Sequence, residues 1–310
     1  MHIVVLRSAV SGRPIDAYVD ALRDRLPDHE ISHARTPDEE RALVAEADVV
    51  TGPTLPPERV TDSLKLFAGV YAGSDHIDLE AFAAHEVPVT SAAGVHTSNV
   101  AEYAIGGLIT LTQEFTEAFR QQERREWRHF GTSELYGSTV TIVGLGAIGR
   151  GIAERLEPFG VETVGIRASP EKGGPTDEVL GPDHLHDALA RSDSVVLACP
   201  LTDETEGLLG SSEFVTMPAH ATLVNVARGP VVDTDALVDA LRWEQIAGAV
   251  LDVTDPEPLP EDHPLWAMEN VLLTPHIAGD TPHYFDRLAD IVAENVARLE
   301  RGEPLRNRVV

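Results

Sequence analysis

The stretch that decides the fold is "TVTIVGLGAIG", residues Thr139–Gly149. A β-branched run leads into Gly144, Gly146 and Gly149, which have the G-x-G-x-x-G spacing, and a helical pattern follows. Small residues let a backbone approach a pyrophosphate, and a helix N-terminus offers free N–H groups and partial positive charge. The stretch therefore predicts a dinucleotide-binding loop between a strand and a helix. A glycine-rich turn that binds nothing is the alternative. Two further residues of the loop are expected to contact the cofactor, Ala147 and Ile148.

The next predicted strand, "VETVGI", ends beside Arg167, where an acidic residue would bind both hydroxyls of a ribose and repel a 2′-phosphate. A guanidinium does the reverse, because it can donate a pair of hydrogen bonds to phosphate oxygens. Ser169 adds a hydroxyl group and Lys172 a second cation. We therefore expect NADP(H) to be preferred, with NAD(H) as the second choice. The alternative is a solvated surface arginine and indifferent use of both cofactors.

Short apolar runs alternate with helical patterns along most of the chain, which predicts an α/β fold of two Rossmann-like, doubly wound parallel sheets. Residues 1–92 and 281–310 are expected to form a flavodoxin-like substrate-binding domain, and residues 93–280 a dinucleotide-binding Rossmann domain. Ligands of such sheets bind at the carboxyl ends of strands, so we expect the active site in the cleft between the domains. A helical pattern of about thirty residues, from Thr97 to Trp127, stands between the two alternations.

The composition argues against nucleic acid as a partner, since 51 acidic residues stand against 24 basic ones and the net charge is −27. No apolar run reaches the length of a membrane helix, and the N-terminus has no signal-peptide pattern, so we expect a cytoplasmic protein with no membrane partner. The acids are spread along the chain, which suggests a protein adapted to high salt. An ordinary acidic cytosolic enzyme is the alternative. The single cysteine, Cys199, excludes an internal disulfide and is expected to pack in the core or to line the cofactor pocket.

Seven motifs occur in order along the chain: "AGSDHID", "NVAEYAIG", "LYGSTVTIVGLGAIG", "PLTDETEGLL", "LVNVARGPVVD", "AVLDVTDPEPLP" and "TPHIAG". Together they resemble the D-isomer-specific 2-hydroxyacid dehydrogenase family, which includes glyoxylate and hydroxypyruvate reductases, over essentially the whole chain. The resemblance implies reduction of 2-oxo acids to D-2-hydroxy acids by hydride transfer from NAD(P)H. It also implies a homodimer paired through the long helical segment and the residues after it.

The family's catalytic residues fall on Arg228 in "NVARG", Glu257 in "DPEPLP" and His276 in "TPHIAG". Arg228 would bind the substrate carboxylate and polarise the neighbouring carbonyl oxygen. His276 would donate the proton that this oxygen gains on reduction, since a histidine can exchange protons near neutral pH. Glu257 would hydrogen-bond the imidazole and orient it. This chemistry needs no metal ion.

The resemblance also implies binding residues. Backbone N–H groups around Ala72, Gly73 and Ser74 would hold the substrate carboxylate, and Arg228 and His276 would also contact the substrate. Asp252 matches the position that binds the nicotinamide carboxamide. Further cofactor contacts are expected at Thr97, Cys199, Pro200, Ala227 and Gly279.

Two alternatives stay open at this point. One is a glyoxylate/hydroxypyruvate reductase of the same family with a narrow pocket. The other is a non-catalytic, nucleotide-sensing binding module of the co-repressor type, which the presence of all three catalytic residue types disfavours.

Overall fold

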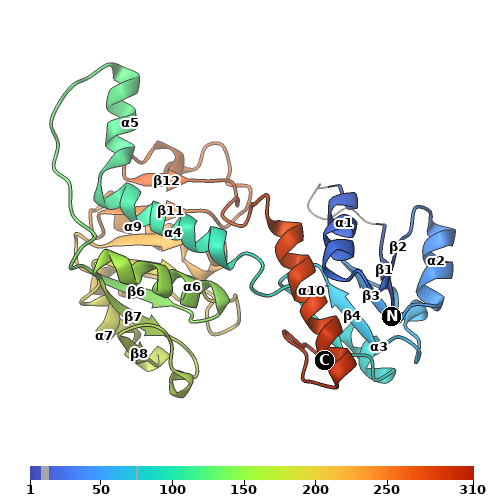
Figure 1. The fold of residues 1–310 in the computed structure, drawn as a ribbon. Coiled ribbons are helices and arrows are strands. Elements are labelled where there is room, and N and C mark those ends of the chain that lie inside the picture. The colour runs from blue at the N-terminus through green and yellow to red at the C-terminus, as the bar shows by residue number, and fades with distance from the viewer. Residues whose placement is uncertain (8–13, 75) are drawn as a thin grey trace. The chain divides into compact units, whose positions relative to one another are not determined.

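The computed structural model describes residues 1–7, 14–74 and 76–310, so Asp75 of the motif "AGSDHID" lies outside the described residues (Figure 1). Its contacts divide the chain into two compact units. The terminal unit comprises Met1–His96 and Thr281–Val310, and the central unit comprises Thr97–Asp280. The assignment of substrate binding to residues 1–92 and 281–310, and of cofactor binding to residues 93–280, stays a prediction.

The described part of the terminal unit holds a parallel sheet of five strands in the order β2-β1-β3-β4-β5, the flavodoxin-like order. Alternate residues of its strands face opposite layers: Ile3 and Val5 pack with α1 and α10, whereas Val4 packs with α2 and α3. Strands buried on both faces in this way are typical of parallel sheets. The elements are β1 (His2–Val5), α1 (Asp16–Arg25), β2 (Glu30–His33), α2 (Pro37–Ala45), β3 (Val49–Gly52), β4 (Leu66–Gly69), α3 (Leu79–Ala84), β5 (Val89–Thr90) and α10 (Tyr284–Arg301).

The central unit holds a parallel sheet of seven strands in the order β12-β11-β10-β9-β6-β7-β8. The chain winds outward from β6 in both directions, which is the doubly wound order with one strand added at the β12 edge. Ile142 of β6 packs with α4 and α6, and its neighbour Val143 packs with α7, α8 and α9 on the other face. The elements are α4 (Thr97–Thr112), α5 (Phe115–Arg124), β6 (Thr139–Val143), α6 (Ala147–Leu156), β7 (Glu162–Ile166), β8 (Glu178–Leu180), α7 (Leu185–Leu189), β9 (Ser194–Leu197), α8 (Ser211–Thr216), β10 (Thr222–Asn225), α9 (Thr234–Arg242), β11 (Gly248–Leu251) and β12 (Val271–Leu273).

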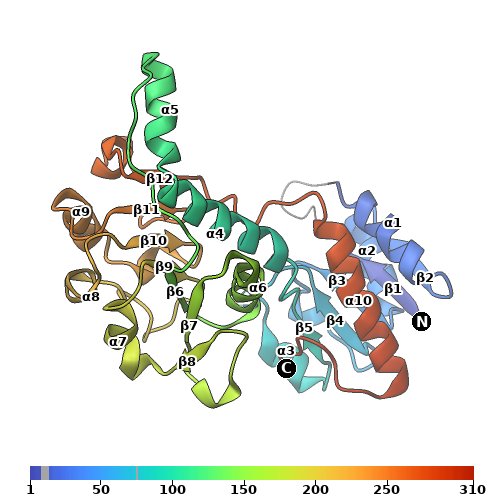
Figure 2. The same cartoon turned by 60° about the vertical axis from the view of Figure 1, so that its left-hand side comes forward.

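The two sheets confirm the predicted fold class, a chain of two parallel α/β domains. The predicted helix of about thirty residues is wrong in its continuity, because Glu114 adopts a left-handed backbone (φ 52°) and separates α4 from α5. In Figures 1 and 2, α5 extends away from the sheet of the central unit. In the part of the chain that the structure describes, every helix is too short or too polar to cross a membrane.

Candidate active site

The glycine loop after β6 is packed too tightly for larger residues at two of its three glycines. Gly144 has φ +97°, and a Cβ there would lie 2.6 Å from the backbone of Cys199. A Cβ on Gly149 would lie 1.9 Å from the carbonyl oxygen of Gly144. Gly146, which caps α6, has open space instead, since a Cβ added there would have no atom within 4 Å apart from those of its chain neighbours. The loop therefore leaves the N-terminus of α6 accessible at Gly146.

A cavity of about 610 Å³, the glycine-loop cavity, opens beside this loop. It brings together six of the residues predicted to bind the cofactor: Gly144, Gly146, Arg167, Ser169, Cys199 and Pro200. Apolar side chains such as Leu185 and Leu208 form part of its wall, while Thr205 and Glu204 add polar groups that the sequence did not indicate. The other predicted cofactor residues lie outside this cavity: Thr97, Ala147, Ile148, Gly149, Ala227, Asp252 and Gly279. Among these, Thr97 starts α4 and its methyl group would meet a Cβ added to Gly151 of α6.

Arg167 both lines the cavity and holds the loop that follows β7. Its Nη1 donates a hydrogen bond to the carbonyl oxygen of Gly173 at 2.5 Å. Glu204 lines the same cavity, and a hydrogen bond from Thr202 keeps the pKa of this carboxyl group below its ordinary value. The cavity is therefore lined by both a guanidinium group and a carboxylate group.

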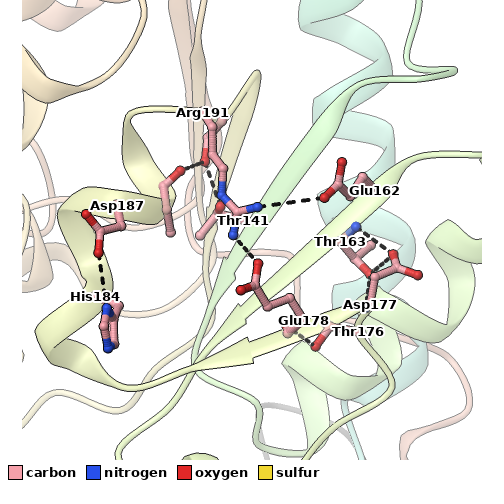
Figure 3. A network of polar contacts seen from close by, with 11 residues as sticks. Thr141, Glu162, Thr163, Thr176, Asp177, Glu178, His184, Asp187 and Arg191 are labelled. Carbon is pink, nitrogen blue, oxygen red and sulfur yellow. Dashed lines mark hydrogen bonds and ion pairs between the residues drawn. The ribbon is translucent and has the colours of Figure 1, made fainter.

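The far end of the Arg167 loop is anchored by the polar network in Figure 3. The backbone N–H and the hydroxyl group of Thr163 both donate to Asp177 Oδ2, at 2.8 Å each, and lower the pKa of Asp177. Arg191 forms ion pairs with Glu178 of β8 and with Glu162 of β7. These contacts fix β8 against β7 and so fix the end of the loop that carries Arg167 and Ser169.

Cys199 follows β9 and is 8% exposed. Burial raises the pKa of its thiol to about 11, so the group is a neutral thiol near pH 7. Cys199 belongs to the core and also lines the glycine-loop cavity, so both expectations for this residue describe its position.

The three predicted catalytic residues follow three neighbouring strands. Arg228 comes after β10, Glu257 after β11 and His276 after β12, and β10, β11 and β12 are adjacent in the parallel sheet. The strands are parallel, so their carboxyl ends lie on the same side of the sheet. The three residues therefore belong to the carboxyl end of the central sheet.

His276 and Glu257 are in direct contact. The Nδ1 atom of His276 lies 2.6 Å from Oε1 of Glu257, and both side chains are about half exposed, at 48% and 42%. The pair lines a second cavity of about 440 Å³, the histidine cavity, together with Asp252, Leu259 and Trp266. An imidazole held in this way by a carboxylate is oriented for proton exchange through its other nitrogen.

Arg228 is exposed and lies outside both cavities. Its Nη1 donates to the carbonyl oxygen of Ala227 at 2.7 Å. Asn225 fixes the turn before it, accepting from the N–H of Ala227 at 3.0 Å and donating to the carbonyl oxygen of Arg228 at 3.2 Å. A Cβ on Gly229 would lie 2.0 Å from the carbonyl oxygen of Thr254, so the chain after Arg228 packs directly on the chain after β11. No sequence pattern indicated the role of Asn225.

Asp252 is 3% exposed and finds its partners in the turn that carries His276. Its carboxylate accepts hydrogen bonds from the hydroxyl group of Thr274 (2.7 Å) and from the backbone N–H groups of Ile277 (2.8 Å) and Ala278 (2.9 Å). A buried carboxylate needs such partners, and these three contacts tie the end of β11 to the turn after β12.

The remaining predicted residues, Ala72, Gly73 and Ser74, follow β4 in the terminal unit. Ala72 and Gly73 are exposed, and the carbonyl oxygen of Ser74 accepts from the N–H of Ile77 at 2.9 Å. Their backbone N–H groups as a site for a carboxylate stay a prediction.

Residues 105–278 match a family model described as "D-isomer specific 2-hydroxyacid dehydrogenase, NAD binding domain". A glyoxylate reductase of Thermofilum pendens is 39% identical over 251 residues, covering 78% of this chain and 73% of that protein. A human glyoxylate reductase/hydroxypyruvate reductase is 36% identical over 252 residues, covering 78% and 76%. A solved D-isomer-specific 2-hydroxyacid dehydrogenase of Xanthobacter autotrophicus Py2, in complex with NADPH and MES, is 32% identical, covers 99% of this chain and 98% of that chain, and has a TM-score of 0.82.

Proposed function

Since the chain belongs to the D-isomer-specific 2-hydroxyacid dehydrogenase family, we propose that it works mainly as a reductase of 2-oxo acids and prefers NADP(H). The observation that carries this proposal is the contact between His276 and Glu257 at the carboxyl end of the sheet, where Arg228 also lies. The family and its relatives support an enzyme over a nucleotide-sensing binding module.

The proposed chemistry assigns one task to each of the three residues. Arg228 binds the carboxylate of the 2-oxo acid and polarises its carbonyl group. His276, protonated at both nitrogens, donates the Nε2 proton to the oxygen that gains charge during reduction, and takes it back in the oxidative direction. Glu257 accepts the hydrogen bond from Nδ1 and so orients the ring and stabilises its charged form.

The glycine loop fits a dinucleotide, because Gly146 leaves open space at the N-terminus of α6 and the glycine-loop cavity adjoins it. Gly144, Gly146 and the backbone around them would hold the pyrophosphate. When bound, the dinucleotide supplies the hydride that adds to the carbonyl carbon.

Two features support the preference for NADP(H). Arg167 stands at the end of β7 in place of an acid, and Ser169 lines the same cavity. Glu204 opposes this preference, because a carboxylate in the cavity would repel a 2′-phosphate. The competing proposal is equal use of both cofactors.

The names of the curated relatives favour small substrates, so a glyoxylate/hydroxypyruvate reductase is the second candidate.

We further propose a homodimer paired through α5 and the residues after it. This segment, residues 115–130, which we call the arm, exposes four aromatic side chains to water in the single chain: Phe115, Phe119, Trp127 and Phe130.

Steady-state rates with glyoxylate, hydroxypyruvate, pyruvate and longer 2-oxo acids test the proposal, each measured with NADPH and with NADH in buffered KCl. We expect reduction of at least one short 2-oxo acid and a higher kcat/KM for NADPH than for NADH. Failure to reduce any of these acids with either cofactor would refute the proposed activity. A clear preference for NADH would refute the proposed cofactor choice alone.

A further inference from the structure

The backbone of His276 needs an explanation beyond its contact with Glu257. His276 has φ +54°, a left-handed conformation that a residue with a Cβ adopts at a cost and keeps only where its surroundings hold it. Its N–H donates to the carbonyl oxygens of Asp252 (2.9 Å) and Thr274 (3.0 Å). The orientation of the imidazole therefore depends on the turn of residues 274–278.

The carboxylate of Asp252 holds this turn at three points, through Thr274, Ile277 and Ala278. Because a carboxylate only accepts hydrogen bonds, the single hydroxyl hydrogen of Thr274 is used in its bond to Asp252. Thr274 Oγ1 also lies 2.5 Å from the hydroxyl oxygen of Tyr103. Tyr103 must then be the donor in that second bond.

Tyr103 belongs to α4, which packs across β10 and β11 (Figure 1). Four residues earlier on the same helix, Asn99 Nδ2 donates to the carbonyl oxygen of Ala278 at 2.7 Å. Residues four apart lie on one face of a helix. One face of α4 therefore contacts the turn at its first residue, Thr274, and at its last, Ala278. Burial raises the pKa of Tyr103 to about 12, and the hydroxyl group therefore keeps its proton across the working range of pH.

We propose that Tyr103 is a positioning residue for His276, acting through the hydroxyl group of Thr274 and the carboxylate of Asp252. The chain of bonds runs from α4 to the turn that sets the direction of the imidazole. This proposal rests on the proposed function only in naming proton transfer by His276 as the step that the positioning serves.

The variant Tyr103→Phe removes the donor and keeps the ring, and Thr274→Val removes the hydroxyl group that relays it. We expect each to lower kcat for 2-oxo acid reduction by about tenfold, with the KM for NADPH little changed, because a displaced acid group slows the chemical step. Thr274→Ser keeps the hydroxyl group and should restore most of kcat. The double variant should be no slower than Thr274→Val alone, since Tyr103 acts through Thr274.

Tyr18→Phe is the matched control. Tyr18 hydrogen-bonds Thr51 at 2.8 Å in the buried core of the terminal unit, so its loss removes the same kind of bond at another place. We expect Tyr18→Phe to lower the melting temperature and leave kcat unchanged. If Tyr103→Phe behaved in the same way, or if the two losses in kcat multiplied in the double variant, the positioning role would be overturned.

Amide hydrogen exchange gives a test that needs no substrate. In Tyr103→Phe, the N–H groups of Ile277 and Ala278 should exchange faster than in the wild type, whereas Tyr18→Phe should leave them unchanged. Unaltered exchange in Tyr103→Phe would overturn the positioning role, whether or not the wild type reduces a 2-oxo acid. A wild type that reduces no 2-oxo acid would refute the proposed function instead.

Discussion

The Nδ1 atom of His276 lies 2.6 Å from Oε1 of Glu257, although 19 positions separate the two residues in the sequence. His276 follows β12 and Glu257 follows β11, so the parallel sheet brings them together at the carboxyl end of these adjacent strands. With Nδ1 bonded to a carboxylate, Nε2 is the ring nitrogen left to exchange a proton with a ligand.

Replacing either member of this pair should therefore slow reduction. We expect His276→Ala to lower kcat by about 10³-fold, because general acid catalysis contributes on that scale. Glu257→Gln should lower kcat by about tenfold, since a neutral amide stabilises the charged imidazole less than a carboxylate does. Initial rates with glyoxylate and NADPH measure both effects.

His220→Ala is the control for this pair of variants. Nε2 of His220 lies 2.8 Å from Oδ1 of Asp193, which precedes β9. The pair therefore repeats the histidine–carboxylate contact at the amino end of the strands. Loss of His220 should leave kcat within about twofold of the wild type. An unchanged kcat in His276→Ala would remove this residue from the mechanism.

Two glycines of the loop should respond differently to alanine. Gly149→Ala would place a methyl group 1.9 Å from the carbonyl oxygen of Gly144, so the backbone must shift and the melting temperature should fall. In Gly146→Ala the new methyl group meets no atom within 4 Å apart from those of its chain neighbours, so the fold should keep its stability while the methyl group obstructs the dinucleotide. Thermal unfolding and NADPH titration separate the two outcomes. Unchanged NADPH affinity in Gly146→Ala would place the pyrophosphate elsewhere.

The cofactor preference should depend on Arg167. In Arg167→Ala, we expect the ratio of kcat/KM for NADPH to that for NADH to fall by about tenfold or more, because the guanidinium can no longer bind a 2′-phosphate. Arg242→Ala is the control, since Arg242 pairs with Asp239 on α9 and lies outside the cavity. An equal fall of both kcat/KM values in Arg167→Ala would indicate that its bond to Gly173 is its main role.

The sequence predicted the interior strands of each sheet and the edge strands β5 and β12, because apolar and β-branched residues dominate these segments. It missed β2 and β8, which are edge strands of four and three residues with partly exposed, mixed side chains. It also missed the break between α4 and α5 at Glu114, since no proline or glycine marks this position. Local pattern carries little information on short segments of mixed polarity and on turns, where tertiary contacts decide the backbone.

The candidate site was predictable where motifs carry chemistry and not where a residue acts through its neighbours. His276, Glu257 and the glycine loop stood out by type and spacing. Asn225, Tyr103 and Glu204 did not, because an amide, a phenol or one more acid has meaning only beside the groups that the fold brings to it.

The arm should be the surface that pairs two copies of the chain. Phe119 is 61% exposed and Trp127 fully exposed, so an apolar contact is the expected use of this segment. Phe119→Asp should shift the mass in solution toward a monomer, as measured by light scattering. Val215→Asp, at a residue 69% exposed on α8, places the same charge on another apolar surface residue and should leave the mass unchanged. A monomeric wild type would remove the dimer proposal.

The charge of −27 should make stability depend on salt, because 51 acidic groups on one chain repel one another more strongly in the folded protein than in the expanded unfolded chain. Raising KCl from ~0.1 M to about 1 M shortens the screening length from about 10 Å to about 3 Å. The exposed ion pairs lost to screening contribute little in comparison. We expect the free energy of unfolding, measured by urea titration, to rise over this range. Sucrose at matched water activity is the control, since it stabilises by exclusion and does not screen charge. A maximal free energy of unfolding at the lowest KCl concentration would contradict the expectation that the protein is adapted to high salt.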